Sequence, residues 1–186
     1  MNVNHHLRLV TLLAVAASAA ACGDPFEPFL TPIPPAQEIE LVDFDDGALV
    51  DPAALDMFTG NPVRTDQTNG WDFLFVVDDT EGPALLPRAG LLGGESEAGL
   101  QHSAETFEVL ADAPDSDYTM DALVPIEPGD VVIMVSRRNP QLLARCRVYG
   151  KLEVLSIEGT PAVVRMNVVI NPNCERRELI DDEEEE

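Results

Sequence analysis

Two long segments near the end of the chain alternate apolar and polar residues, and they constrain the fold more than any other feature. Residues 146–157 read CRVYGKLEVLSI, residues 162–174 read AVVRMNVVINPNC, and EGTP separates them. In both segments the apolar residues occupy mainly the even positions, which is the period-two pattern of a strand with one face on a core. The sequence therefore predicts an antiparallel hairpin whose even positions point inward.

The register of this hairpin follows from its two inward faces. Even positions share one face only if the numbers of paired residues add to an even sum, because a slip of one residue reverses every side chain. A sum of 320 leaves a three-residue loop, Gly159–Pro161, which is a common hairpin length. It also places Val154 opposite Met166, and Cys146 opposite Cys174 at a separation that a disulfide can bridge. We therefore predict a Cys146–Cys174 disulfide; two reduced cysteines at a sheet end are the alternative.

Further short strands separated by turns predict an all-β fold, either an antiparallel sandwich or a barrel-like domain closed by the disulfide hairpin. The expected strands are residues 38–44, 71–77, 118–124 and 131–135. Residues 84–92 form a weaker extended segment, and residues 52–58 fit either one turn of helix or an irregular loop. Residues 93–102 are expected to form a loop and residues 103–114 a short helix that ends before a proline.

The chain divides into four parts by composition. Residues 1–21 carry a basic start, an apolar run and three alanines, which is the pattern of a signal peptide. Residues 22–37 are rich in proline and predict an extended tether. Residues 38–178 are the expected β domain, and residues 179–186 are an acidic tail expected to be disordered.

Cys22 directly follows the alanines, in the sequence SAAACGDP. This resembles the signal peptides of bacterial lipoproteins, although Ala19 stands where that family usually has leucine. The resemblance implies acyl chains on Cys22 that hold the protein at a membrane of the bacterial cell envelope, on the outer membrane or facing the periplasm. Cleavage by an ordinary signal peptidase at the same alanines is the alternative.

The charge distribution limits the possible partners. There are 34 acidic and 11 basic residues, and a net charge of −23 argues against nucleic-acid binding. Eight of the ten basic residues after residue 21 lie between residues 137 and 177. Arg147, Lys151 and Arg165 share the outer face of the predicted hairpin, so they are a candidate anion-binding patch. Alternatively, these cations balance nearby acidic residues.

Few residues are suited to catalysis or metal binding. Ser96 lies in GESEA, which nearly matches a nucleophile elbow but lacks the required strand, helix and histidine. His102 is the only histidine after residue 21 and has no evident partner. The aspartates of DFDDG, residues 43–47, fit a turn better than a calcium loop, and two cysteines with one histidine are too few for zinc. We expect a protein that is not an enzyme and has no metal or cofactor.

Three short segments are similar to parts of the HmuY-type haem-binding lipoproteins: FDDGALVD (44–51), GWDFLF (70–75) and VYGKLEVL (148–155). The resemblance implies a lipid-anchored all-β domain that binds a ligand. Members that bind haem use paired histidines or methionines, and no histidine pair follows the signal peptide here. We expect a domain that binds a small ligand or a partner protein. A structural subunit of an envelope assembly is the first alternative and haem binding a remote one.

Overall fold

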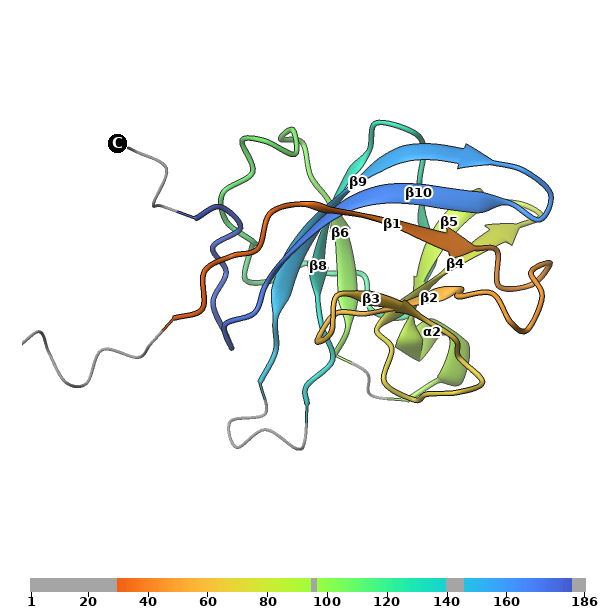
Figure 1. The fold of residues 1–186 in the computed structure, drawn as a ribbon, viewed down its shortest axis with the longest axis horizontal. Helices are drawn as coiled ribbons and strands as arrows, with labels where there is room; N and C mark the ends of the chain where they lie inside the picture. Colours follow the sequence, from red (N-terminus) through yellow and green to blue (C-terminus); the bar gives the residue numbers. More distant parts are fainter. Residues whose placement is uncertain (1–29, 95–96, 140–145, 182–186) are drawn as a thin grey trace, which may run out of the picture. The chain divides into compact units, whose positions relative to one another are not determined.

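The computed structural model describes residues 30–94, 97–139 and 146–181. These residues form two five-stranded antiparallel sheets that pack against each other, with one short helix (Figure 1). The predicted all-β antiparallel sandwich is therefore confirmed, and both sheets keep open edges instead of closing into a barrel. The signal peptide, Cys22, Ser96 and residues 182–186 of the acidic tail lie outside the described residues.

The first sheet has the strand order β1-β10-β9-β8-β6. Its strands are β1 (Gln37–Val42), β6 (Gly99–His102), β8 (Val131–Val135), β9 (Tyr149–Glu158) and β10 (Val163–Asn171). The second sheet has the order β3-β2-β4-β5-β7. Its strands are β2 (Ala54–Asp56), β3 (Asn61–Val63), β4 (Phe73–Asp78), β5 (Gly82–Pro87) and β7 (Val124–Pro125). Helix α2 (Arg88–Leu92) directly follows β5.

The β9–β10 hairpin has the predicted register over most of its length. Leu152 pairs with Val168 and Val154 with Met166, so the paired numbers add to 320 as expected. The register shifts by one between Arg165 and Met166, and nearer the turn the sum is 321. Such a bulge takes one extra residue into one strand. The turn therefore has four residues, 159–162, and the predicted three-residue loop is wrong.

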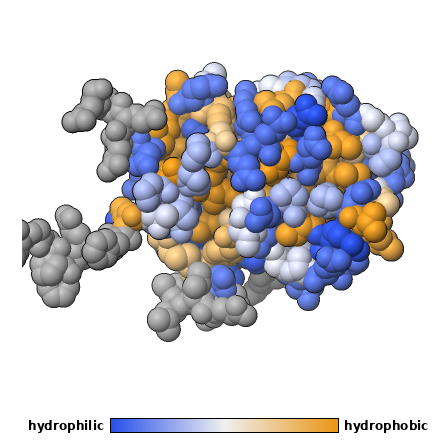
Figure 2. Space-filling model, in the orientation of Figure 1, coloured by the Kyte–Doolittle hydropathy of each residue, from blue (hydrophilic) through white to orange (hydrophobic). Residues whose placement is uncertain are grey.

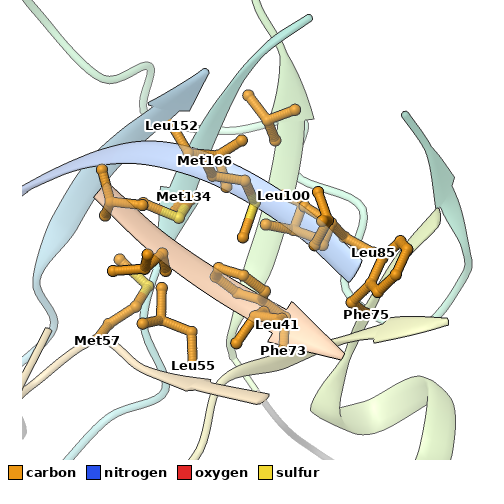
Figure 3. Close-up of a cluster of buried hydrophobic side chains, with 14 of the residues drawn as sticks. Leu41, Leu55, Met57, Phe73, Phe75, Leu85, Leu100, Met134, Leu152 and Met166 are labelled. Carbon is orange, nitrogen blue, oxygen red and sulfur yellow. The ribbon is translucent and has the colours of Figure 1, made fainter. Parts of the chain in front are cut away.

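The main core lies between the sheets (Figure 3). The even positions of β10, and those of β9 as far as Val154, point into it as predicted, and beyond the bulge Ile157 packs against it instead. They meet the aromatic face of β4, where Phe73 and Phe75 are fully buried together with Leu55 of β2. The alternation of the sequence thus determines which face of each sheet is buried.

A second apolar cluster covers the outer face of the first sheet. Phe107, Leu110 and Leu179 pack there on odd-numbered residues of β8, β9 and β10. This cover explains why all five residues of β8 are buried, as expected of a strand that is apolar on both faces. It also extends the domain beyond residue 178, because Leu179 is only 1% exposed.

Five other predictions are wrong because tertiary contacts decide the local structure. Within residues 52–58, expected to be one turn of helix or an irregular loop, Ala54–Asp56 form β2, which pairs with β3 and β4. Residues 103–114 contain a single turn in place of a helix, since Ala113 N–H donates to the carbonyl of Arg177 across the second cluster. Residues 88–92 are helical, and residues 99–102 form β6 within the predicted loop. Only an isolated bridge at Thr119 and the two-residue β7 occupy the expected strand 118–124.

Candidate functional site

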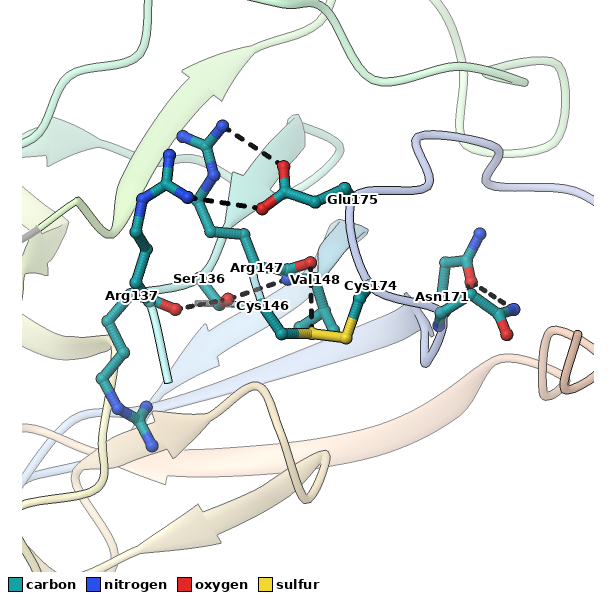
Figure 4. The surroundings of a disulfide bond; sticks show 10 residues. Ser136, Arg137, Cys146, Arg147, Val148, Asn171, Cys174 and Glu175 are labelled. Atoms are coloured by element: carbon teal, nitrogen blue, oxygen red, sulfur yellow. Dashed lines mark hydrogen bonds and ion pairs between the residues drawn. A yellow bond between two sulfur atoms is a disulfide. The ribbon is translucent and has the colours of Figure 1, made fainter. Parts of the chain in front are cut away.

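The disulfide joins Cys146, before β9, to Cys174, after β10, with 5.0 Å between the two Cα atoms (Figure 4). The predicted pairing is therefore confirmed. Next to it, the amide side chain of Asn173 holds the backbone of Thr31: Thr31 N–H donates to Oδ1 at 2.8 Å, and Nδ2 donates to the Thr31 carbonyl at 2.7 Å. The disulfide end of the hairpin thus fixes the segment that leads into β1.

A cleft of about 270 Å³ opens at this end of the domain. We call it the inter-sheet cleft, and it is lined by Pro34, Pro35, Gln37, Met57, Phe58, Thr59, Gly60, Val148, Val168, Ile170 and Pro172. One wall is the even face of β10, and the opposite wall is the segment after β2. Its lining is mainly apolar, and its polar side chains are those of Gln37 and Thr59. This is the usual composition of a small-ligand site.

A buried ion cluster supports the wall of the cleft after β2. Asp72, which is 0% exposed, accepts from Met57 N–H at 2.8 Å and from Arg137 Nη1 at 2.6 Å. Arg137 follows β8, and its Nη2 donates to Asp56 of β2 at 3.0 Å while its guanidinium lies 5.1 Å from the centre of the Phe58 ring. The Arg137 cluster (Asp56, Phe58, Asp72 and Arg137) therefore joins the two sheets and positions the residues that line the cleft.

The charges in this cluster perturb one another. Burial raises the pKa of Asp72 above its ordinary value, since the carboxylate loses its hydration. The positive charge of Arg137 and the N–H donors of Arg137 and Met57 oppose that rise. Asp72 therefore depends on Arg137 for the stabilisation of its ionised form.

The three cations of the predicted anion patch lie on the odd face of the hairpin, but they do not form one exposed patch. Arg147 pairs with Glu175 at 3.5 Å, as Figure 4 shows, and Arg165 pairs with Glu38 and Glu40 on β1. Lys151 is 3% exposed beneath the second apolar cluster. The sequence pattern correctly placed these residues on one face of the hairpin. It did not reveal that the segment containing Phe107 and Leu110 covers Lys151.

A second hollow, of about 390 Å³, lies on this outer face over Lys151. We call it the lysine pocket, and it is lined by Ile33, Pro34, Pro35, Ala36, Phe107, Glu108, Lys151, Val169, Leu179, Ile180 and Asp181. Val169 lines the lysine pocket and its neighbour Val168 lines the inter-sheet cleft, so the two hollows lie on opposite faces of β10. Pro34 and Pro35 contribute to both.

The lysine pocket gives a testable pH dependence. Burial lowers the pKa of Lys151 from its ordinary 10.5, and the negative charge of Glu108 partly opposes that shift. The native ammonium therefore releases its proton before the unfolded chain does. We expect the stability of the wild type to rise relative to that of a Lys151→Met variant when pH is raised from about 7 to about 10.

The measurement is urea unfolding of both proteins at several pH values in that range. Glu108 and Asp181, the other charged residues of the pocket, are present in both proteins, so they do not distinguish the two. Stability curves that stay parallel would contradict a desolvated ammonium at Lys151.

The remaining candidate residues have structural partners. His102 Nε2 lies 2.9 Å from the carbonyl oxygen of Pro125, and Asp43 Oδ1 accepts from Val77 N–H at 3.1 Å. Residues 43–47 form a turn, as preferred from the sequence. Met57, Met134 and Met166 all belong to the main core, and Met57 also lines the inter-sheet cleft. Within the described ranges, no group of three or more His, Cys, Asp or Glu residues is placed to hold a metal ion.

Comparison with protein-family models, curated proteins and solved structures finds no match to this chain. In the part of the chain that the structure describes, no helix is long and apolar enough to cross a bilayer. What the protein does must therefore be inferred from its own residues.

Proposed function

We propose that this chain is a lipid-anchored protein of the bacterial cell envelope whose β domain binds a small apolar ligand in the inter-sheet cleft. The cleft is the observation that carries the proposal. It is concave, its walls are largely apolar, and both walls are fixed by strong restraints: the Arg137 cluster on one side and the disulfide end of the hairpin on the other. Preformed walls reduce the ordering cost of binding.

The test of the cleft uses the neutral fluorescent probe N-phenyl-1-naphthylamine and the full chain. We expect the probe to bind, and a Thr59→Trp variant to weaken binding by about tenfold, since Thr59 is an exposed residue that lines the cleft. Thr80→Trp is the matched control. Thr80 is also exposed, but it lies in the turn between β4 and β5, away from the cleft lining.

Equal binding by the Thr59→Trp and Thr80→Trp variants, or no binding by the wild type, would contradict a ligand site in the cleft.

The alternative function, a structural subunit of an envelope assembly, is supported by a different feature, a pair of exposed apolar residues. Leu49 and Val50 are neighbours, and they are 80% and 68% exposed. Exposed apolar residues of this kind are suited to contact with another protein, and Figure 2 shows that apolar residues reach the surface on the face drawn there.

The anchor has its own test, which does not depend on the ligand. The position of Cys22 between alanines and a proline-rich segment supports acylation. The confirmed Cys146–Cys174 disulfide supports it as well, since it leaves Cys22 without an intramolecular partner. Mass spectrometry of the protein extracted from membranes should show acyl chains on Cys22. An unmodified Cys22 thiol would contradict the anchor and leave the ligand proposal unaffected.

The resemblance to HmuY-type proteins makes haem a remote alternative ligand. Incubation of the full chain with haemin tests this directly, because axial ligation by the protein shifts the Soret band. An unchanged spectrum would exclude haem and would leave smaller apolar ligands as candidates.

A further inference from the structure

The buried amine of Lys151 is not used by the proposed function. Its Nζ donates to the carbonyl oxygens of Phe107, at 2.6 Å, and of Leu110, at 2.9 Å, and lies 4.9 Å from the centre of the Phe107 ring. An ammonium has three N–H donors, so one donor is left. Among the ion pairs of the described residues, none includes Lys151. A buried cation held by neutral oxygens alone is costly unless an anion completes its shell.

The surroundings of Lys151 define what could complete that shell. The walls of the lysine pocket are largely aliphatic or aromatic and come from three separate segments: residues 33–36, Phe107 and residues 179–180. These walls favour an apolar chain, and they offer a small inorganic anion no side-chain donor besides Lys151. Glu108 and Asp181 also line the pocket, and they disfavour ligands that carry several negative charges.

We propose that the lysine pocket binds an amphiphile with a single carboxylate, whose carboxylate accepts a hydrogen bond from Nζ of Lys151 and whose apolar chain lies against the pocket walls. This site is separate from the inter-sheet cleft, because the two lie on opposite faces of β10. The inference therefore goes beyond the proposed function and does not rest on it.

The test is isothermal titration of the full chain with sodium dodecanoate and, separately, with dodecanol. We expect dodecanoate to bind about tenfold or more tightly than dodecanol, which is the difference expected for a hydrogen bond to a charged group. In a Lys151→Gln variant the two affinities should become similar. Equal affinity of the wild type for the two probes, or no binding of dodecanoate, would overturn the proposal.

A second pair of variants keeps the test valid if Lys151→Gln fails to fold. Ile180 lines the pocket and Leu155 lies on β9 outside it, and both are 37% exposed. We expect Ile180→Asp to weaken dodecanoate binding by about tenfold or more, since it adds a repelling charge to the wall, and Leu155→Asp to leave binding unchanged. Equal effects of the two substitutions would contradict a ligand in this pocket.

The Thr59→Trp variant separates this site from the inter-sheet cleft. We expect it to bind N-phenyl-1-naphthylamine about tenfold more weakly than the wild type and to bind dodecanoate unchanged. Loss of dodecanoate in that variant would place the carboxylate in the cleft and would overturn its assignment to Lys151.

Discussion

An Arg137→Met variant is expected to lose about 3–5 kcal/mol of the free energy of unfolding, which is the usual cost of removing one partner of a buried ion pair. Arg137 lies at 2.6 Å from Oδ2 of the fully buried Asp72 and at 3.0 Å from Oδ1 of Asp56. Methionine keeps most of the apolar stem but leaves both carboxylates without their cation. Because Arg137 follows β8 of the first sheet, while Asp56 ends β2 and Asp72 precedes β4 of the second, the loss also removes a link between the sheets.

Arg165→Met provides the matched control for that measurement. Arg165 also pairs with two acidic residues, Glu38 and Glu40, but all three side chains are about half exposed. An exposed pair contributes about 0–1 kcal/mol, so we expect little change in the urea midpoint. Similar losses in the two variants would show that burial does not determine how much the Arg137 cluster contributes to the free energy of unfolding.

The cost of Arg137→Met should also depend on pH. Burial already raises the pKa of Asp72 in the wild type, and loss of the Arg137 charge removes the main influence that opposes this rise. The native variant then binds a proton that the unfolded chain binds only at lower pH, so its stability falls as pH rises through the raised value. We expect a smaller difference between variant and wild type at about pH 4 than at about pH 7, measured by urea unfolding.

The sequence predicted the β9–β10 hairpin well because the alternation of apolar and polar residues within each strand shows which of its faces is buried. Alternation identified the inward face, the turn limited the register, and the two together placed Cys146 opposite Cys174. The same rule failed for Asp72, which occupies a polar position of a predicted strand and is nonetheless fully buried. Its cation, Arg137, is 65 residues away, and alternation within one strand contains no information about such a partner.

The two hollows were missed for a related reason. Segments without regular structure form a wall of each hollow. Pro34 and Pro35 line both, the residues after β2 complete the inter-sheet cleft, and Phe107 with Glu108 completes the lysine pocket. The sequence suggested a short helix over residues 103–114 that ends before a proline, and this segment contains Phe107 and Leu110. In the structure their carbonyl oxygens accept hydrogen bonds from Lys151. In a helix these carbonyl groups would accept from backbone N–H groups, and here the buried lysine takes the place of those donors. The fold must first bring Lys151 beside residues 107–110, so the local sequence of this segment could not reveal the arrangement.

A Cys146→Ala/Cys174→Ala double variant is expected to lose about 3.5 kcal/mol of the free energy of unfolding, the value for a loop of this length in the chain-entropy description. The two cysteines are 28 residues apart, and the bond between them restricts the unfolded chain. Urea unfolding measures the loss. Cys22→Ala is the matched control, since it removes a cysteine that we place outside the pair, and its stability should equal that of the wild type.

The same double variant should release the segment that leads into β1. Asn173 is adjacent to Cys174 and holds the backbone of Thr31 by two hydrogen bonds. Without the disulfide, residues 172–175 lose one of their attachments to the start of β9. The amide of Thr31 should therefore exchange with solvent much faster. The amide of Val164, in the core of β10, should lose protection only by as much as the free energy of global unfolding falls. Hydrogen exchange compares the two amides directly. Equal losses at Thr31 and Val164 would mean that Asn173 keeps its position without the disulfide, and that the wall of the inter-sheet cleft near Pro34 is fixed by β1 instead.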